Sequence, residues 1–91
     1  MNKTTLGIIG GGQLGSLLAS AAKKIDIKTI IFCDDINAPG QKFSDGFIFS
    51  DYHNEKKINE FIDKVDIVTF EFENIPFETL NIINESKKVL P

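Results

Sequence analysis

A glycine-rich segment near the N-terminus restricts the possible folds of this chain more than any other feature. Residues 10–15 read G-G-G-Q-L-G and fit the pattern G-x-G-x-x-G. The segment follows a short apolar run, residues 6–9, that has the character of a buried strand. It precedes apolar residues that recur at helical spacing, namely Leu14, Leu17, Leu18, Ala21, Ala22 and Ile25. A glycine turn between a strand and a helix is typical of α/β domains with a parallel sheet.

The rest of the chain continues this alternation of strand and helix patterns. Further strands are predicted at residues 28–33, 46–49 and 66–72, a turn at Pro39-Gly40, and the start of a fifth strand at Val89-Leu90. One helix is predicted from Ile58, Phe61, Ile62 and Val65, and another with Pro76 in its first turn, followed by Phe77, Leu80 and Ile83. Such alternation favours a Rossmann-like three-layer α/β domain, whose common strand order is 3-2-1-4-5. Because the fifth strand starts as the sequence ends, we expect a truncated chain.

Composition excludes several kinds of partner. The 91 residues suffice for one small domain, and their net charge is −3, with no basic run. That balance argues against binding to nucleic acid or to an anionic membrane surface. The chain contains no Arg, so no guanidinium clamp for a phosphate can come from it. Cys33 is the single cysteine, which fits a reducing cytoplasm, and neither a signal peptide nor a membrane span is present.

The glycine segment has the properties of an anion receptor. A turn of this kind requires backbone angles that a Cβ disfavours, and a ligand phosphate must approach the main chain closely. The first N–H groups of the following helix, with the helix dipole, then attract the phosphate. The alternative is a tight turn without a ligand. Asp34 ends the second strand 19 residues after Gly15, where dinucleotide-binding domains hold a ribose hydroxyl. An acidic residue at a strand end is also a common cap or solvated turn residue.

A second acidic cluster lies at the predicted end of the fourth strand, where residues 69–76 read T-F-E-F-E-N-I-P. On a strand, Glu71 and Glu73 share one face. Strands one and four are neighbours in the 3-2-1-4-5 order, so Glu73 and the glycine segment should face one cleft. A carboxylate suits a ribose diol, and together these groups describe a ribonucleotide site. The residues alone leave open that both carboxylates are merely exposed, and for Asn74 they favour capping of the next helix.

Several segments, taken in order, resemble the N-terminal domain of the N5-carboxyaminoimidazole ribonucleotide synthetase family. They are GIIGGGQLG at 7–15, Asp34, Ser44-Asp45, Ser50-Asp51-Tyr52 and FEFENIP at 70–76. In this family, and in the related formate-dependent glycinamide ribonucleotide transformylase, the domain precedes two ATP-grasp subdomains.

The resemblance implies a role for particular residues. Gly12, Gln13 and Leu14 would bind the phosphoribosyl group of the substrate, and Glu73 the ribose hydroxyls. Secondary candidates are Gly10, Gly15, Asp34, Glu71 and Asn74. Ser16 departs from the family, which commonly has Arg there. Neither a catalytic residue nor a metal ligand is expected in this segment.

The resemblance also implies the activity of the full-length enzyme, a ligase of purine biosynthesis. Such an enzyme uses MgATP to activate bicarbonate as carboxyphosphate. It then carboxylates the exocyclic amine of 5-aminoimidazole ribonucleotide, giving the N5-carbamate, ADP and phosphate. This pre-ATP-grasp segment would position the substrate without catalysing, and a homodimer is the family expectation.

Two other classes of function compete with this interpretation. One is an NAD(P)- or FAD-binding Rossmann domain of an oxidoreductase, which Asp34 favours. The other is a regulatory Rossmann-like module that binds no phosphate. The E-F-E-N segment has no role in dinucleotide recognition, and it therefore favours the ligase.

Overall fold

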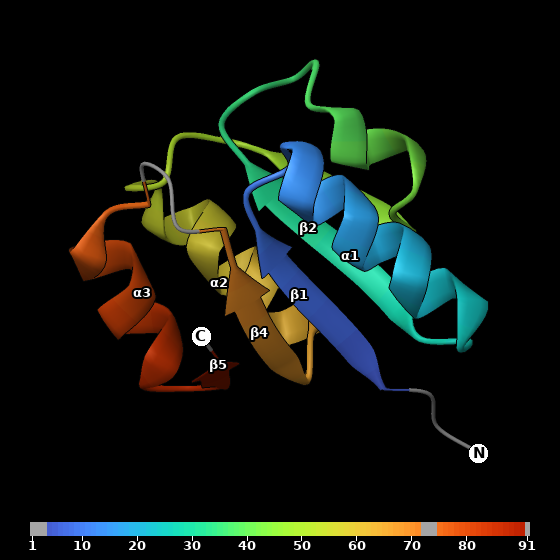
Figure 1. The fold of residues 1–91 in the computed structure, drawn as a ribbon. Helices are drawn as coiled ribbons and strands as arrows, with labels where there is room; N and C mark the ends of the chain where they lie inside the picture. Colours follow the sequence, from blue (N-terminus) through green and yellow to red (C-terminus); the bar gives the residue numbers. More distant parts are fainter. Residues whose placement is uncertain (1–3, 72–74, 91) are drawn as a thin grey trace.

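The strands form one sheet in which every pairing is parallel (Figure 1). A computed structural model describes residues 4–71 and 75–90. Its strands are Thr5–Ile9 (β1), Lys28–Cys33 (β2), Gly46–Phe49 (β3), Ile67–Phe70 (β4) and Lys88–Leu90 (β5). Their order is β3-β2-β1-β4-β5, so the predicted order is confirmed.

The helices cover both faces of the sheet. Figure 1 shows α1 (Gln13–Lys24) on one face, together with the short 3₁₀ helix η1 (Pro39–Lys42). On the opposite face lie α2 (Glu55–Lys64) and α3 (Phe77–Asn84). Each crossover between parallel strands passes over one face, which produces the three layers. The α/β, Rossmann-like prediction is therefore confirmed.

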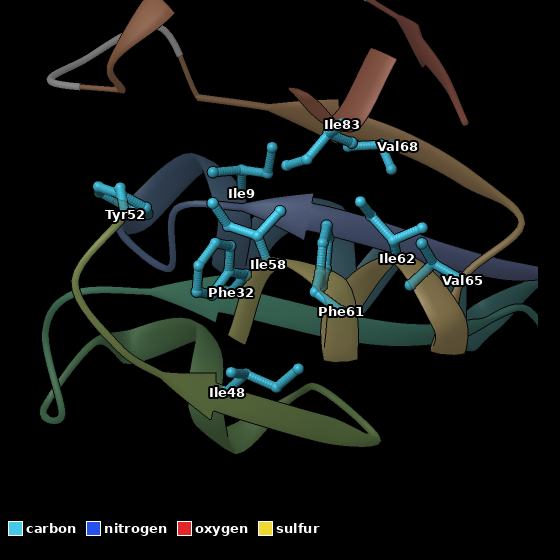
Figure 2. Close-up of a cluster of buried hydrophobic side chains, with 10 residues drawn as sticks. All are labelled: Ile9, Phe32, Ile48, Tyr52, Ile58, Phe61, Ile62, Val65, Val68 and Ile83. Atoms are coloured by element: carbon cyan, nitrogen blue, oxygen red, sulfur yellow. The ribbon is translucent and has the colours of Figure 1, made fainter. Parts of the chain in front are cut away.

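Two apolar clusters form the core, one on each side of the sheet. Neighbouring strand residues point to opposite faces, so Ile8 joins the cluster under α1 and Ile9 the cluster under α2 and α3. Figure 2 shows the larger cluster, in which the Phe32 ring stacks on Phe61 at 5.4 Å and meets the edge of Tyr52 at 5.6 Å. Its buried members are Ile9, Phe32, Ile48, Tyr52, Ile58, Phe61, Ile62, Val65, Val68 and Ile83.

Helix α1 packs on the sheet through small residues. Its buried positions are Gly15, Ala19 and Ala22, because the helix lies close to the strands. The apolar stripe in the sequence is therefore not the buried face: Leu17 is 63% exposed and Ile25 68% exposed. The predicted helix is confirmed, whereas most of its predicted apolar stripe faces outward.

The fourth strand and the third helix differ in detail from the prediction. Strand β4 ends at Phe70 rather than Phe72, although the Glu71 N–H still donates to the Ile9 carbonyl at 3.0 Å. Pro76 occupies the N-cap of α3, one position before the first turn, without a side-chain cap bond. Phe77 is exposed instead of packing inward. Asn74, the expected cap, lies outside the described residues.

Among the described residues, no helix is long and apolar enough to cross a membrane.

Candidate functional site

The glycine loop leaves the sheet at the carboxyl end of β1, beside the end of β4 (Figure 1). Gly10 has a φ of +102°, in the region that side chains with a Cβ rarely adopt. Its N–H donates to the Phe32 carbonyl on β2 at 2.8 Å. The expectation that the turn needs glycine is therefore confirmed at Gly10.

The Glu71 carboxylate enters this loop. Its Oε1 accepts the N–H of Gly12 at 2.6 Å and the N–H of Gly15 at 3.2 Å. These donors lie at the N-cap and in the first turn of α1, where the helix dipole favours a negative charge. The anion receptor expected from the sequence thus already holds a carboxylate of the same chain. Glu71 and Gly12 are 59 positions apart in the sequence.

The close approach to the glycines is made by this carboxylate. A Cβ placed on Gly12 would lie 2.9 Å from Glu71 Oε2, and one on Gly15 would lie 2.8 Å from Oε1 and 2.5 Å from the Gly10 carbonyl oxygen. In the sequence interpretation a ligand phosphate makes this close approach; in the structure the Glu71 carboxylate lies against Gly12 and Gly15, and the binding of a phosphate stays a prediction. An acidic residue directly after the strand that neighbours a glycine loop is the signal that could have identified the contact.

Two further N–H groups, those of Gln13 and Leu14, lie at the start of α1. Ser16 N–H donates to the Gly12 carbonyl at 2.9 Å, which is the first intrahelical bond. In the part of the chain that the structure describes, the N–H groups of Gln13 and Leu14 have no acceptor. Both residues are exposed. Their main chain can therefore donate two hydrogen bonds to an anion from outside.

The segment after β2 supports the loop from its other side. Gly40 N–H donates to the Gly11 carbonyl at 2.8 Å, and a Cβ on Gly11 would lie 2.8 Å from the Ala38 Cβ. Asp34 follows β2 and is exposed, and within residues 4–71 and 75–90 its carboxylate makes no hydrogen bond to the glycine loop. Asp34 therefore lies at the expected strand end, but it takes no part in shaping the loop.

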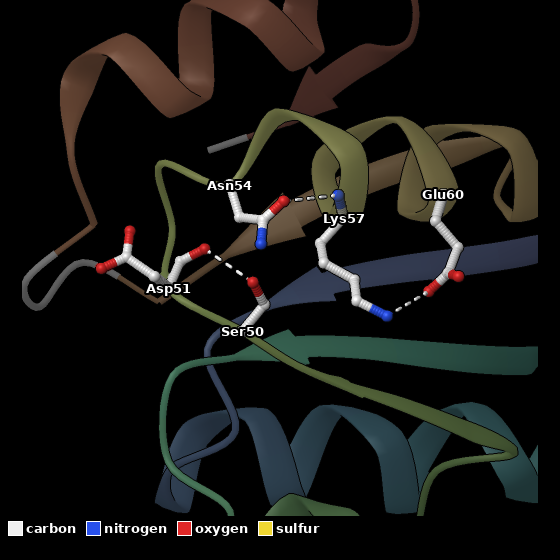
Figure 3. Close-up of polar contacts among 5 residues, drawn as sticks. All are labelled: Ser50, Asp51, Asn54, Lys57 and Glu60. Atoms are coloured by element: carbon white, nitrogen blue, oxygen red, sulfur yellow. Dashed lines mark hydrogen bonds and ion pairs between the residues drawn. The ribbon is translucent and has the colours of Figure 1, made fainter.

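The turn after β3 is ordered by its own polar groups, as Figure 3 shows. Ser50 Oγ donates to the Asp51 carbonyl at 3.0 Å, and Asn54 Oδ1 accepts the Lys57 N–H at 3.1 Å as the N-cap of α2. The Thr79 hydroxyl donates to the Tyr52 carbonyl at 2.6 Å, which ties α3 to this turn. The Ser50–Asp51–Tyr52 segment thus has a structural role in the described chain.

The remaining predictions concern Glu73 and Asn74, which lie outside the described residues. No three His, Cys, Asp or Glu side chains in residues 4–71 and 75–90 gather closely enough to hold a metal ion.

The fold and the loop together define a class of protein, the Rossmann-like α/β domains with a glycine loop at the switch point between the first and fourth strands. The family profile of the ribonucleotide synthetase preATP-grasp domain matches residues 3–91. The chain belongs to this family.

Several relatives of known identity cover most of this chain. The N5-carboxyaminoimidazole ribonucleotide synthase of Staphylococcus aureus strain COL is 36% identical over 85 residues, which are 93% of this chain and 23% of that protein. The crystal structure of the N5-carboxyaminoimidazole synthetase from Staphylococcus aureus superposes with a TM-score of 0.87 and 35% identity, over 98% of this chain and 26% of that one. The Aspergillus clavatus synthase in complex with ADP and 5-aminoimidazole ribonucleotide superposes with a TM-score of 0.82 and 27% identity, over 99% of this chain and 24% of that one. The chain spans about a quarter of the length of these relatives.

Proposed function

We propose that this chain is the substrate-binding domain of an ATP-grasp ligase. The ligase carboxylates 5-aminoimidazole ribonucleotide with bicarbonate, at the expense of ATP, to give N5-carboxyaminoimidazole ribonucleotide in purine biosynthesis. The observation that carries the proposal is the contact of Glu71 with Gly12 in a chain of the preATP-grasp family. This contact joins the glycine loop to the end of β4, the two segments that a ribonucleotide would have to bridge.

The proposal gives each segment a separate part of the substrate. The N–H groups of Gln13 and Leu14 would bind the phosphate, while Gly12 borders it with its own N–H already donated to Glu71. Glu73 follows Glu71 by two positions and would accept hydrogen bonds from the ribose hydroxyls. Because Glu71 already accepts the N–H groups of Gly12 and Gly15, the phosphate would lie beside the N–H groups of Gln13 and Leu14.

In this proposal the ATP-grasp subdomains of the full-length enzyme, and not this domain, carry out the ligation. The described residues offer no group of side chains suited to Mg²⁺, so we derive no step through MgATP from this chain. Its contribution is to bind and orient the ribonucleotide. The buried free thiol of Cys33 supports a cytoplasmic enzyme, and a homodimer and bicarbonate as co-substrate belong to the same proposal.

Binding of the ribonucleotide to the 91-residue chain tests the proposal. In ¹H–¹⁵N NMR spectra, 5-aminoimidazole ribonucleotide should shift the amide signals of Gln13 and Leu14. Glu73→Gln should weaken this binding about tenfold, because a neutral amide accepts more weakly than a carboxylate and cannot accept at both ends. NMR detects millimolar affinity, which suits one domain of a multidomain site.

The control is Asp34→Asn, which removes the same charge from the end of β2 and should leave the affinity within about twofold. The oxidoreductase alternative makes the opposite prediction. Micromolar binding of NADH, lost in Asp34→Asn and kept in Glu73→Gln, would refute the ligase assignment.

A further inference from the structure

The carboxylate of Glu71 occupies a position that other glycine-loop domains keep open for their ligand. In dinucleotide-binding domains, the second glycine of G-x-G-x-x-G allows the pyrophosphate to approach the main chain at the helix N-terminus. Here the second glycine is Gly12, and the space above it contains Glu71 Oε2. The Gly12 and Gly15 N–H groups, which could bind an external phosphate, are bonded to Oε1. The loop sequence is thus shared with dinucleotide sites, while its receptor is partly filled.

We propose that Glu71 is the specificity-determining residue of the glycine loop: its carboxylate excludes a bridging pyrophosphate and leaves the Gln13 and Leu14 N–H groups for one phosphate monoester. The monoester half of this statement rests on the proposed function, whereas the exclusion half rests on the contacts of Glu71 alone.

Charge and space both support the exclusion. An anion placed over Gly12 would lie against the half-buried Glu71 carboxylate and meet a repulsion that water screens incompletely, and a bridging pyrophosphate needs that position. Glu71 is held by two backbone donors and by its place directly after β4, where its own N–H donates to Ile9. The side chain therefore cannot leave without giving up its bonds to the N–H groups of Gly12 and Gly15.

The loop offers only backbone donors to a phosphate, because it contains no basic residue. The chain contains no Arg, and Ser16, in the first full turn of α1, is neutral. One phosphate monoester on the Gln13 side of the loop would be bound by the N–H groups of Gln13 and Leu14, since Glu71 already neutralises part of the helix dipole.

Selectivity between two probes tests the role of Glu71. Dissociation constants for inorganic pyrophosphate and ribose 5-phosphate are measured on the ¹⁵N-labelled 91-residue chain, and their ratio is compared between variants. Glu71→Ala opens the receptor, so the ratio should change about tenfold or more in favour of pyrophosphate. The Gly12 and Gly15 amide signals should then respond to pyrophosphate, and NADH should begin to bind. Glu71→Gln removes the charge but keeps an acceptor, and its ratio should change about threefold or more.

Asp34→Asn is the matched control, because it removes one negative charge without touching the loop. Its ratio should equal that of the wild type. An unchanged ratio in folded Glu71→Ala, or an equal change in Asp34→Asn, would overturn the proposal. Should Glu71→Ala not fold, the nearly isosteric Glu71→Gln decides, and a wild-type ratio in that variant overturns the proposal. Failure of the wild type to bind any ribonucleotide would instead refute the proposed function, so the two failures are distinguishable.

Discussion

Tyr52 shows how a single buried side chain can report on the fold. Its ring is 7% exposed and meets the Phe32 ring edge-on. Burial raises the pKa of the Tyr52 phenol well above its usual value; the Cys33 side chain and the negative charge of Asp34 add to this effect, while a hydrogen bond with the Asp34 backbone opposes it. The neutral phenol is therefore favoured in the folded state.

The stability of the chain should fall as pH rises above about 10, the pKa of an exposed tyrosine. Below that pH both states keep the proton, and the contribution of Tyr52 is complete. Above it the unfolded state loses the proton first, so unfolding becomes more favourable. Tyr52 is the sole tyrosine and the chain has no Trp, so absorbance at 295 nm follows this residue. Ionisation should coincide with unfolding measured by circular dichroism.

Tyr52→Phe provides the comparison, because the lysines titrate equally in both proteins. Its unfolding free energy should depend less on pH between 10 and 12 than that of the wild type. Ionisation of Tyr52 near pH 10 in a chain that stays folded would contradict the burial argument.

At the scale of elements, helix α2 depends on its cap. Asn54 Oδ1 accepts the Lys57 N–H, and Glu55 follows in the first turn, where a negative charge is favourable. Asn54→Ala should lower the free energy of unfolding by about 1 kcal/mol, measured by urea denaturation. Asn59→Ala makes the same change at an exposed site within α2 and should be neutral or slightly stabilising. Equal effects of the two substitutions would show that the cap contributes nothing.

Most elements could be predicted from the sequence, but not every buried face. Strands β2 and β3 have the predicted bounds, because their β-branched and aromatic runs lie between turn residues. The buried face of α1 was not predicted, since Gly15 and Ala19 carry little hydrophobic signal while the exposed Leu17 carries much. Close packing of a helix on a sheet depends on small side chains, and hydrophobic periodicity does not detect them.

The candidate site was predictable in location but not in its contacts. The strand order and the loop indicated that the glycine segment and the end of β4 lie together. Which group fills the receptor depends on where β4 ends, because a shift of one residue redirects Glu71. Sequence patterns leave strand ends uncertain by a few residues, so the carboxylate could not be assigned to Gly12 in advance.

At the scale of the whole molecule, the stability of the domain depends strongly on the packing of Phe61. Its ring is fully buried between α2 and the sheet, stacks on Phe32, and lies where a Cβ on Gly7 would be. Phe61→Ala should cost about 3–5 kcal/mol, a large part of the roughly 5–15 kcal/mol that stabilises a typical domain. Phe49→Ala, at a half-exposed position on β3, should cost about 1 kcal/mol. Chemical denaturation measures both, and similar losses would argue against a core centred on Phe61.

The bond between Glu71 and Gly12 also has a consequence for the order of assembly. It spans 59 residues, so β1, α1, β2, β3 and α2 all precede its acceptor along the chain. A polypeptide that emerges from the ribosome contains the complete glycine motif long before it has a shaped receptor. Recognition by this loop is therefore a late property of folding, acquired when β4 joins the sheet beside β1.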